Sequence, residues 1–163
     1  MAEQERPLAM LVRLTRLSND RHAFEAVRSD GATERLELET RSFLLHDLVH
    51  FALESEAGLD AGFFGLLARG EPYQSSAETF AGEAGRIEKV VAMLQGAVSG
   101  GDVDPVVFVE RASAAFESLG ERAPDWLTVG LVERTLERLR ALRGHWRATP
   151  FGKTMELEFL TSG

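Results

Sequence analysis

Two histidines in this sequence are spaced so that their side chains would leave a helix on the same side. His46 and His50 are four residues apart, which on an α-helix places them one turn apart on one face. Imidazole nitrogens at this spacing can bind the same metal ion. Asp47 stands between them, and Glu54 follows one turn after His50. We therefore treat His46 and His50 as candidate ligands of a divalent metal ion.

The pentapeptide His46-Asp-Leu-Val-His50 resembles the zinc-binding HExxH helix of metalloproteases, although the resemblance covers only five of 163 residues. Asp47 stands where that family has its catalytic glutamate and is one methylene shorter. The resemblance implies a metal-dependent hydrolase in which the metal polarises water or substrate and Asp47 or Glu54 acts as the base. A complete site needs a third ligand, for which His22 and His145 are the remaining histidines.

A solvated polar face explains the same residues without a metal. On an amphipathic helix His46, Asp47, His50 and Glu54 fall together, opposite a broad apolar side. Glu54 would then support a charged His50 from one turn away. Glu54 lies about 12 Å from His46 along the helix axis, too far for easy convergence on one ion. The sequence leaves both interpretations open.

Positive charge collects near the end of this acidic chain. Arg138, Arg143 and Arg147 lie on the last predicted helix and its exit, with Arg134 and Arg140 beside them. Planar guanidinium groups bind phosphates and carboxylates, so the first three are candidate anion-binding residues. Cations near a helix C-terminus also complement the helix dipole, which explains most of them without a ligand.

Composition excludes several classes of protein. The absence of cysteine rules out disulfides, thiolate metal sites and a cysteine nucleophile. The net charge of -8 argues against binding to nucleic acid or to an anionic membrane. Residues 1–7 lack the features of a secretion signal and no stretch is apolar enough to span a bilayer, so we expect a cytoplasmic protein. Only Lys89 and Lys153 among the 18 cations are lysines, a bias that suggests a GC-rich bacterial genome.

These residues must be positioned by a fold of mixed class. Length and composition predict one domain over residues 1–163. Period-two patterns predict a three-stranded meander in the first 40 residues and a C-terminal hairpin with strands at 145–149 and 154–160. Since a lone hairpin is marginal in water, we expect both ends to join in one antiparallel sheet packed against about five helical segments, an α+β fold. The helices are predicted at about 40–57, 60–69, 75–98, 104–119 and 128–143.

Local signals mark the helix ends. Ser75 and Glu78 form a capping-box pattern for the third helix, whose apolar positions include Phe80, and Asp104 caps the fourth. Gly144 is predicted to end the last helix. The glycines at 58, 62 and 65 match no dinucleotide or phosphate-binding motif and are expected to end one helix and let the next pack closely.

Two functions are compatible with these patterns. The first is a non-enzymatic binding or interaction module of bacterial type, with an exposed strand edge or apolar patch as its site and a protein partner or self-association as a homodimer. The alternative is a metal-dependent hydrolase with His46 and His50 as ligands. A divalent metal is the one cofactor that the sequence suggests.

Overall fold

Four strands form one antiparallel sheet in the computed structural model, which describes residues 9–78 and 81–160. A meander is built from β1 (Ala9–Arg16), β2 (Arg21–Val27) and β3 (Thr33–Glu39), and β4 (Thr154–Leu160) pairs with β1. The strand order is β3-β2-β1-β4. The predicted α+β class, the meander and the joining of the two chain ends in one sheet are confirmed.

The sheet has one buried face and one solvated face, as the alternating patterns require. On the buried face Leu14 of β1 lies opposite Phe24 of β2, and both are fully enclosed. On the other face Arg13 lies between Glu25 and Glu156 and forms ion pairs of 3.4 and 3.1 Å with them. The sheet therefore presents only its apolar face to the helices.

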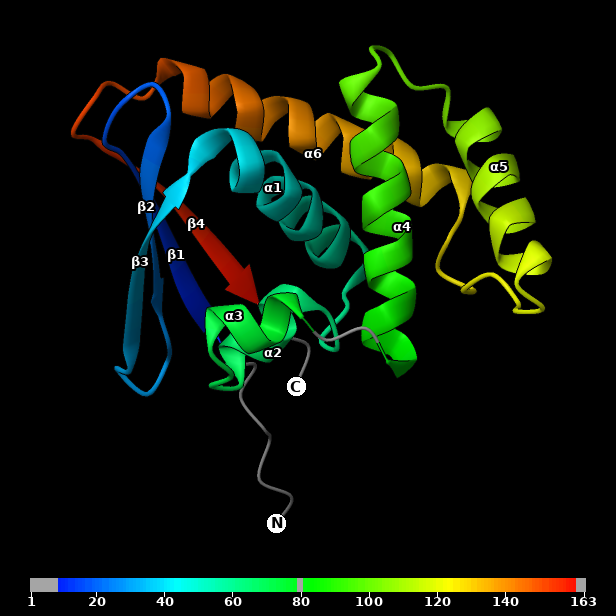
Figure 1. Ribbon diagram of the computed structural model, residues 1–163, viewed down its shortest axis with the longest axis horizontal. Coiled ribbons are helices and arrows are strands. Elements are labelled where there is room, and N and C mark those ends of the chain that lie inside the picture. Colours follow the sequence, from blue (N-terminus) through cyan, green and yellow to red (C-terminus); the bar gives the residue numbers. More distant parts are fainter. Residues whose placement is uncertain (1–8, 79–80, 161–163) are drawn as a thin grey trace.

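Six helices are present among the described residues. They are α1 (Thr40–Ala57), α2 (Phe63–Ala68), α3 (Tyr73–Ala77), α4 (Gly82–Ser99), α5 (Pro105–Ser118) and α6 (Val129–Ala148). In Figure 1 α1 and α6 lie beside the sheet, α4 lies beyond α1, and α5 is farthest from the strands. None of these helices is both long and apolar enough to cross a bilayer.

The central helix of the molecule is α1, which packs against α6, α4, α2 and the sheet. Every residue from position 47 to position 54 is buried, so this helix has no solvated side over two turns. It ends where predicted, because Gly58 adopts the left-handed conformation with φ 64°. Its polar residues must consequently find partners inside the protein.

The C-terminal hairpin was predicted with one strand too many. Residues 145–148 belong to α6, which runs through Gly144 without interruption. The physical reason is packing: Leu139, Leu142 and Trp146 continue one buried face of the helix at spacings of three and four residues. The turn after α6 leads directly into β4, which pairs with β1 rather than with a neighbouring C-terminal strand.

The start of α4 was also predicted incorrectly. Ser75 lies inside the short helix α3, which the sequence analysis did not anticipate, and α4 begins only at Gly82. Burial of Tyr73 and Ser76 holds α3 against the core. Phe80 and residues 1–7 lie outside the described residues. The cap of α5 is confirmed, because Asp104 accepts hydrogen bonds from the first turn.

Candidate functional site

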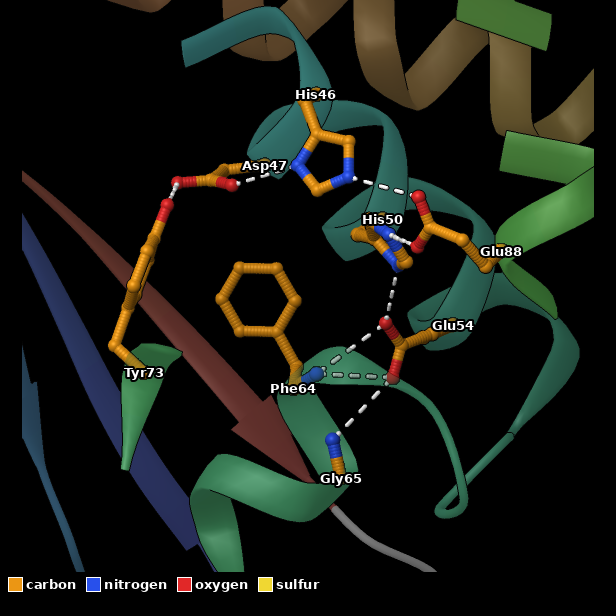
Figure 2. Close-up of polar contacts among 8 residues, drawn as sticks. All are labelled: His46, Asp47, His50, Glu54, Phe64, Gly65, Tyr73 and Glu88. Carbon is orange, nitrogen blue, oxygen red and sulfur yellow. Dashed lines mark hydrogen bonds and ion pairs between the residues drawn. The ribbon is translucent and has the colours of Figure 1, made fainter. Parts of the chain in front are cut away.

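Three potential metal ligands meet where α1 packs on α4. His46 and His50 extend from α1, and both direct Nε2 toward the carboxylate of Glu88 on α4 (Figure 2). The distances are 3.2 Å from His46 Nε2 to Oε1 and 2.7 Å from His50 Nε2 to Oε2. One ligand atom from each of the three residues lies within 4.8 Å of the other two.

The imidazole of His50 is fixed from behind by Glu54. Nδ1 of His50 donates to Glu54 Oε2 at 3.0 Å, and the same carboxylate accepts the backbone N–H groups of Phe64 and Gly65 at 3.1 and 3.3 Å. These N–H groups belong to the first turn of α2, so Glu54 caps that helix from another element. A methyl group at Gly62 would collide with this carboxylate. Glu54 therefore orients the His50 ring and caps the start of α2.

A second carboxylate holds His46 in the same way. Nδ1 of His46 lies 3.0 Å from Asp47 Oδ1, and Tyr73 Oη donates to Asp47 Oδ2 at 2.9 Å. Each histidine thus has a carboxylate at Nδ1 and presents Nε2 to Glu88. Metal-binding histidines in proteins commonly form such a hydrogen bond at the nitrogen that does not bind the metal. This hydrogen bond fixes the ring and raises the basicity of the ligand nitrogen.

The carboxylates also control protonation in the metal-free state. Burial alone would lower the pKa of His46, but its hydrogen bonds with Asp47 and Glu88 outweigh burial and raise the pKa to about 9. The pKa of His50 is also raised, because Glu54 and Glu88 overcome the effect of burial. Burial favours the neutral form of Glu88, yet the two imidazoles lower its pKa to about 2. Without metal, these contacts therefore favour the charged form of the imidazoles and the ionised form of Glu88.

This set of ligands suits a metal ion of intermediate hardness, such as Zn²⁺, which binds both nitrogen and oxygen atoms. Two imidazole nitrogens and one carboxylate are a common set for Zn²⁺, which bonds to such atoms at about 2.0–2.2 Å. A tetrahedral ion separates its ligand atoms by about 3.4 Å at these bond lengths, so small movements of the side chains would suffice. The side chains of His46 and Glu88 are 20% and 21% exposed while His50 is 2% exposed. The site is closed behind His50 and reaches the surface beside the other two.

The solvated-face interpretation of the α1 polar stripe is wrong. Asp47, His50 and Glu54 are 1%, 1% and 0% exposed, although they are hydrogen-bonded as that interpretation allowed. The apolar residues of α1 cover too wide an arc for the opposite side to face water, because α2, α4 and α6 surround the helix. Because these side chains are buried, they form hydrogen bonds with defined groups of the protein and not with water.

The expected third ligand comes from neither remaining histidine. His22 is buried on β2, where Nδ1 contacts Thr40 Oγ1 at 2.9 Å, and His145 is exposed on α6. Glu88 was not among the predicted site residues. One signal was available, because buried Gly85 and Val91 lie one turn to either side of this carboxylate. That spacing places Glu88 at the edge of the buried face.

The two carboxylates considered as bases lie on the far side of the imidazoles. Asp47 and Glu54 contact Nδ1 atoms, whereas a metal would lie at the Nε2 atoms. Their observed contacts suit them to orient ligands. In this conformation neither is directed toward a water on the metal.

The predicted arginine group is divided in the structure. Arg138 Nε forms a 2.7 Å ion pair with Glu56 Oε1, and Arg134 approaches the same carboxylate at 3.6 Å. Arg143 and Arg147 instead line a cavity farther along α6, together with Arg140. Arg138 is not part of that lining.

Comparison with protein-family models, curated proteins and solved structures gave no match.

Proposed function

We propose that this protein binds one divalent transition-metal ion, Zn²⁺ or an ion of similar ligand preference, through His46 Nε2, His50 Nε2 and Glu88. The observation that supports the proposal is the convergence of these groups from two helices. Each imidazole is also held at its other nitrogen by a buried carboxylate, so the ligand atoms are oriented before the ion arrives.

A metal-free ionic clamp between α1 and α4 is the competing explanation. Burying ionised groups costs desolvation energy, which their mutual attraction only partly offsets. An apolar seam would join the helices at least as well. A metal-binding role accounts for the direction of both Nε2 atoms toward one carboxylate, whereas a clamp needs only one such contact.

Metal titration of untagged, chelator-treated protein tests the proposal. We expect Zn²⁺ to bind at a stoichiometry of one by calorimetry, confirmed by elemental analysis after gel filtration. His50→Ala and Glu88→Gln should each weaken binding by about 100-fold or more, since each removes one ligand from three.

His145→Ala is the matched control, because it removes an exposed histidine outside the site. Its affinity for Zn²⁺ should stay within about twofold of the unaltered protein. Equal loss in His145→Ala and His50→Ala would refute the assignment, as would the absence of stoichiometric binding.

Metal-dependent hydrolysis is a second candidate function, favoured by the number of ligands. Three protein ligands leave a coordination position for water, as in catalytic zinc sites. We would assay ester and phosphodiester cleavage with p-nitrophenyl acetate and bis-p-nitrophenyl phosphate. Turnover that requires Zn²⁺ and is lost in Glu88→Gln would support this candidate, whereas binding without turnover would favour a non-enzymatic metal-binding module.

A further inference from the structure

The C-terminal half of α6 carries three arginines that pair with no carboxylate in the described part of the chain. Within residues 9–78 and 81–160 no Asp or Glu oxygen lies within the 4.0 Å ion-pair distance of Arg140, Arg143 or Arg147, whereas Arg134 and Arg138 on the same helix share Glu56. The protein has 26 acidic residues and a net charge of -8. Three unpaired cations therefore lie along one stretch of α6 although the chain is rich in acidic residues.

These arginines line a cavity of about 610 Å³ between α6, the end of α4 and the segment that follows it. Leu136 of α6 and Val103 of the following segment contribute partly exposed apolar surface. Asp102 also lines the cavity and supplies a hydrogen-bond acceptor. Small-molecule sites commonly have volumes of about 300–1,000 Å³ and combine apolar walls with a few polar groups. The cavity has the size of a small-molecule site, and its three exposed arginines supply the charge to hold an anion.

The positive charge extends to a second cavity. Arg143 and Arg147 also line a cavity of about 270 Å³, where Arg41 of α1 joins them. The helix dipole favours cations at this end of α6. It does not explain why cations from α1 and α6 gather around two cavities whose described linings include one acidic residue, Asp102. Mutual repulsion of these guanidinium groups would be relieved by a bound anion.

We propose that the larger cavity binds a small organic phosphate monoester, separately from the metal site. Guanidinium groups form paired hydrogen bonds with phosphate oxygens, and Arg140, Arg143 and Arg147 offer three such forks to one phosphate. The organic part of the ligand would lie against the partly exposed side chains of Leu136 and Val103. Asp102 would accept a hydrogen bond from a ligand hydroxyl.

Calorimetric titration with phenyl phosphate tests this site at about 150 mM salt, which screens non-specific attraction. Inorganic phosphate serves as the second probe. We expect phenyl phosphate to bind at a stoichiometry of one and at least about tenfold more tightly than inorganic phosphate, because only the former contacts the apolar wall. Arg143→Ala with Arg147→Ala should weaken phenyl phosphate binding by at least about tenfold.

Arg122→Ala is the matched control, since it removes the same charge from an exposed position outside the cavity. It should leave binding within about twofold. Arg143→Lys keeps the positive charge but removes the paired hydrogen bonds of the guanidinium group. We therefore expect an intermediate loss of affinity for phenyl phosphate. The proposal fails if phenyl phosphate does not bind at about 10 mM, if Arg122→Ala weakens binding as much as the cavity variants, or if both probes bind equally.

Discussion

Glu54 connects the candidate metal site to the fold. Its carboxylate is fully buried and accepts hydrogen bonds from His50 and from two backbone N–H groups of α2. Glu54→Gln keeps the size of the side chain but replaces one acceptor oxygen with a donor that faces other donors. We predict a loss of about 2–4 kcal/mol in the free energy of unfolding, measured by urea denaturation.

Glu56→Gln is the control for that substitution. Glu56 lies two residues away and pairs with Arg138 and Arg134, which are largely exposed. Exposed ion pairs contribute about 0–1 kcal/mol, so this variant should unfold almost like the unaltered protein. Equal effects of the two substitutions would show that the Glu54 network does not stabilise the fold.

Stability of the metal-free protein should depend on pH through His46. Its pKa is about 9 in the folded protein against 6.5 as the reference value, so the folded state binds the proton more tightly. The resulting stabilisation is fully present below pH 6.5 and is lost as pH rises toward 9. The raised pKa of His50 acts in the same direction. We predict a fall on the order of 2 kcal/mol in the free energy of unfolding across this window, measured by urea denaturation with chelator present.

His46→Ala should reduce this pH dependence, and His145→Ala should preserve it. His145 is exposed and has no part in the site. A pH profile that is unchanged in His46→Ala would contradict the assigned protonation of the cluster.

The sequence predicted the residues of the site that are close together in the chain. His46 and His50 were found because helical spacing alone brings them to one face. Glu88 is 38 residues beyond His50, and only the packing of α4 on α1 brings it near. The polar face of α1 was predicted to be exposed to solvent for the same reason. Whether a helix face meets water depends on the neighbouring helices, which the pattern within α1 does not reveal.

The contact between α1 and α2 depends on a residue without a side chain. Gly62 precedes α2, and a methyl group there would collide with the Glu54 carboxylate. That carboxylate cannot move away without losing its hydrogen bonds. We predict that Gly62→Ala lowers the free energy of unfolding by about 1–3 kcal/mol and weakens Zn²⁺ binding by about tenfold, measured by urea denaturation and calorimetry.

Gly144→Ala is the matched control at the level of the helix. Gly144 lies within α6, and a methyl group there meets no atom within 4 Å. Alanine favours the helix by about 0.8–1.0 kcal/mol over glycine, so this variant should be more stable than the unaltered protein. If both alanine variants were destabilised, or neither, the proposed collision between a methyl group at position 62 and Glu54 would be contradicted.

Elements were predictable where local signals and packing agree. Asp104 and Pro105 marked the start of α5, and alternating residues marked all four observed strands. Gly144 predicted the end of the last helix because glycine often ends helices. Packing of Trp146 against the core prevailed over that local preference, extended α6 to Ala148 and removed the predicted strand at residues 145–149.

The order of periodicities along the chain explains why the α+β class could be predicted. Period-two segments lie at both ends and helical segments lie between them, so an antiparallel sheet joining the ends buries the apolar faces. The positions of α4 and α5 were not predictable in this way. Their apolar faces can dock on several surfaces, and the pairing of α4 with α1 is what creates the candidate metal site.

A metal at His46, His50 and Glu88 would link the central helix to α4 and should stabilise the whole protein. Binding to the folded state alone adds about 2.7 kcal/mol when free metal is 100-fold above its dissociation constant. In a protein of this size each kcal/mol raises Tm by about 2–4 °C, so we predict an increase of about 5–10 °C with Zn²⁺ in thermal denaturation.

A second metal ion, Mg²⁺, and the variant Glu88→Gln test whether the stabilisation depends on a metal bound between α1 and α4. Mg²⁺ prefers oxygen ligands and should leave Tm unchanged, and Glu88→Gln should remove the response to Zn²⁺ because α4 then supplies no anionic ligand. A Zn²⁺ response that persists in Glu88→Gln would place the ion elsewhere. A response confined to the unaltered protein would show that the two helices are joined through the metal, since Glu88 is the only one of the three proposed ligands that belongs to α4.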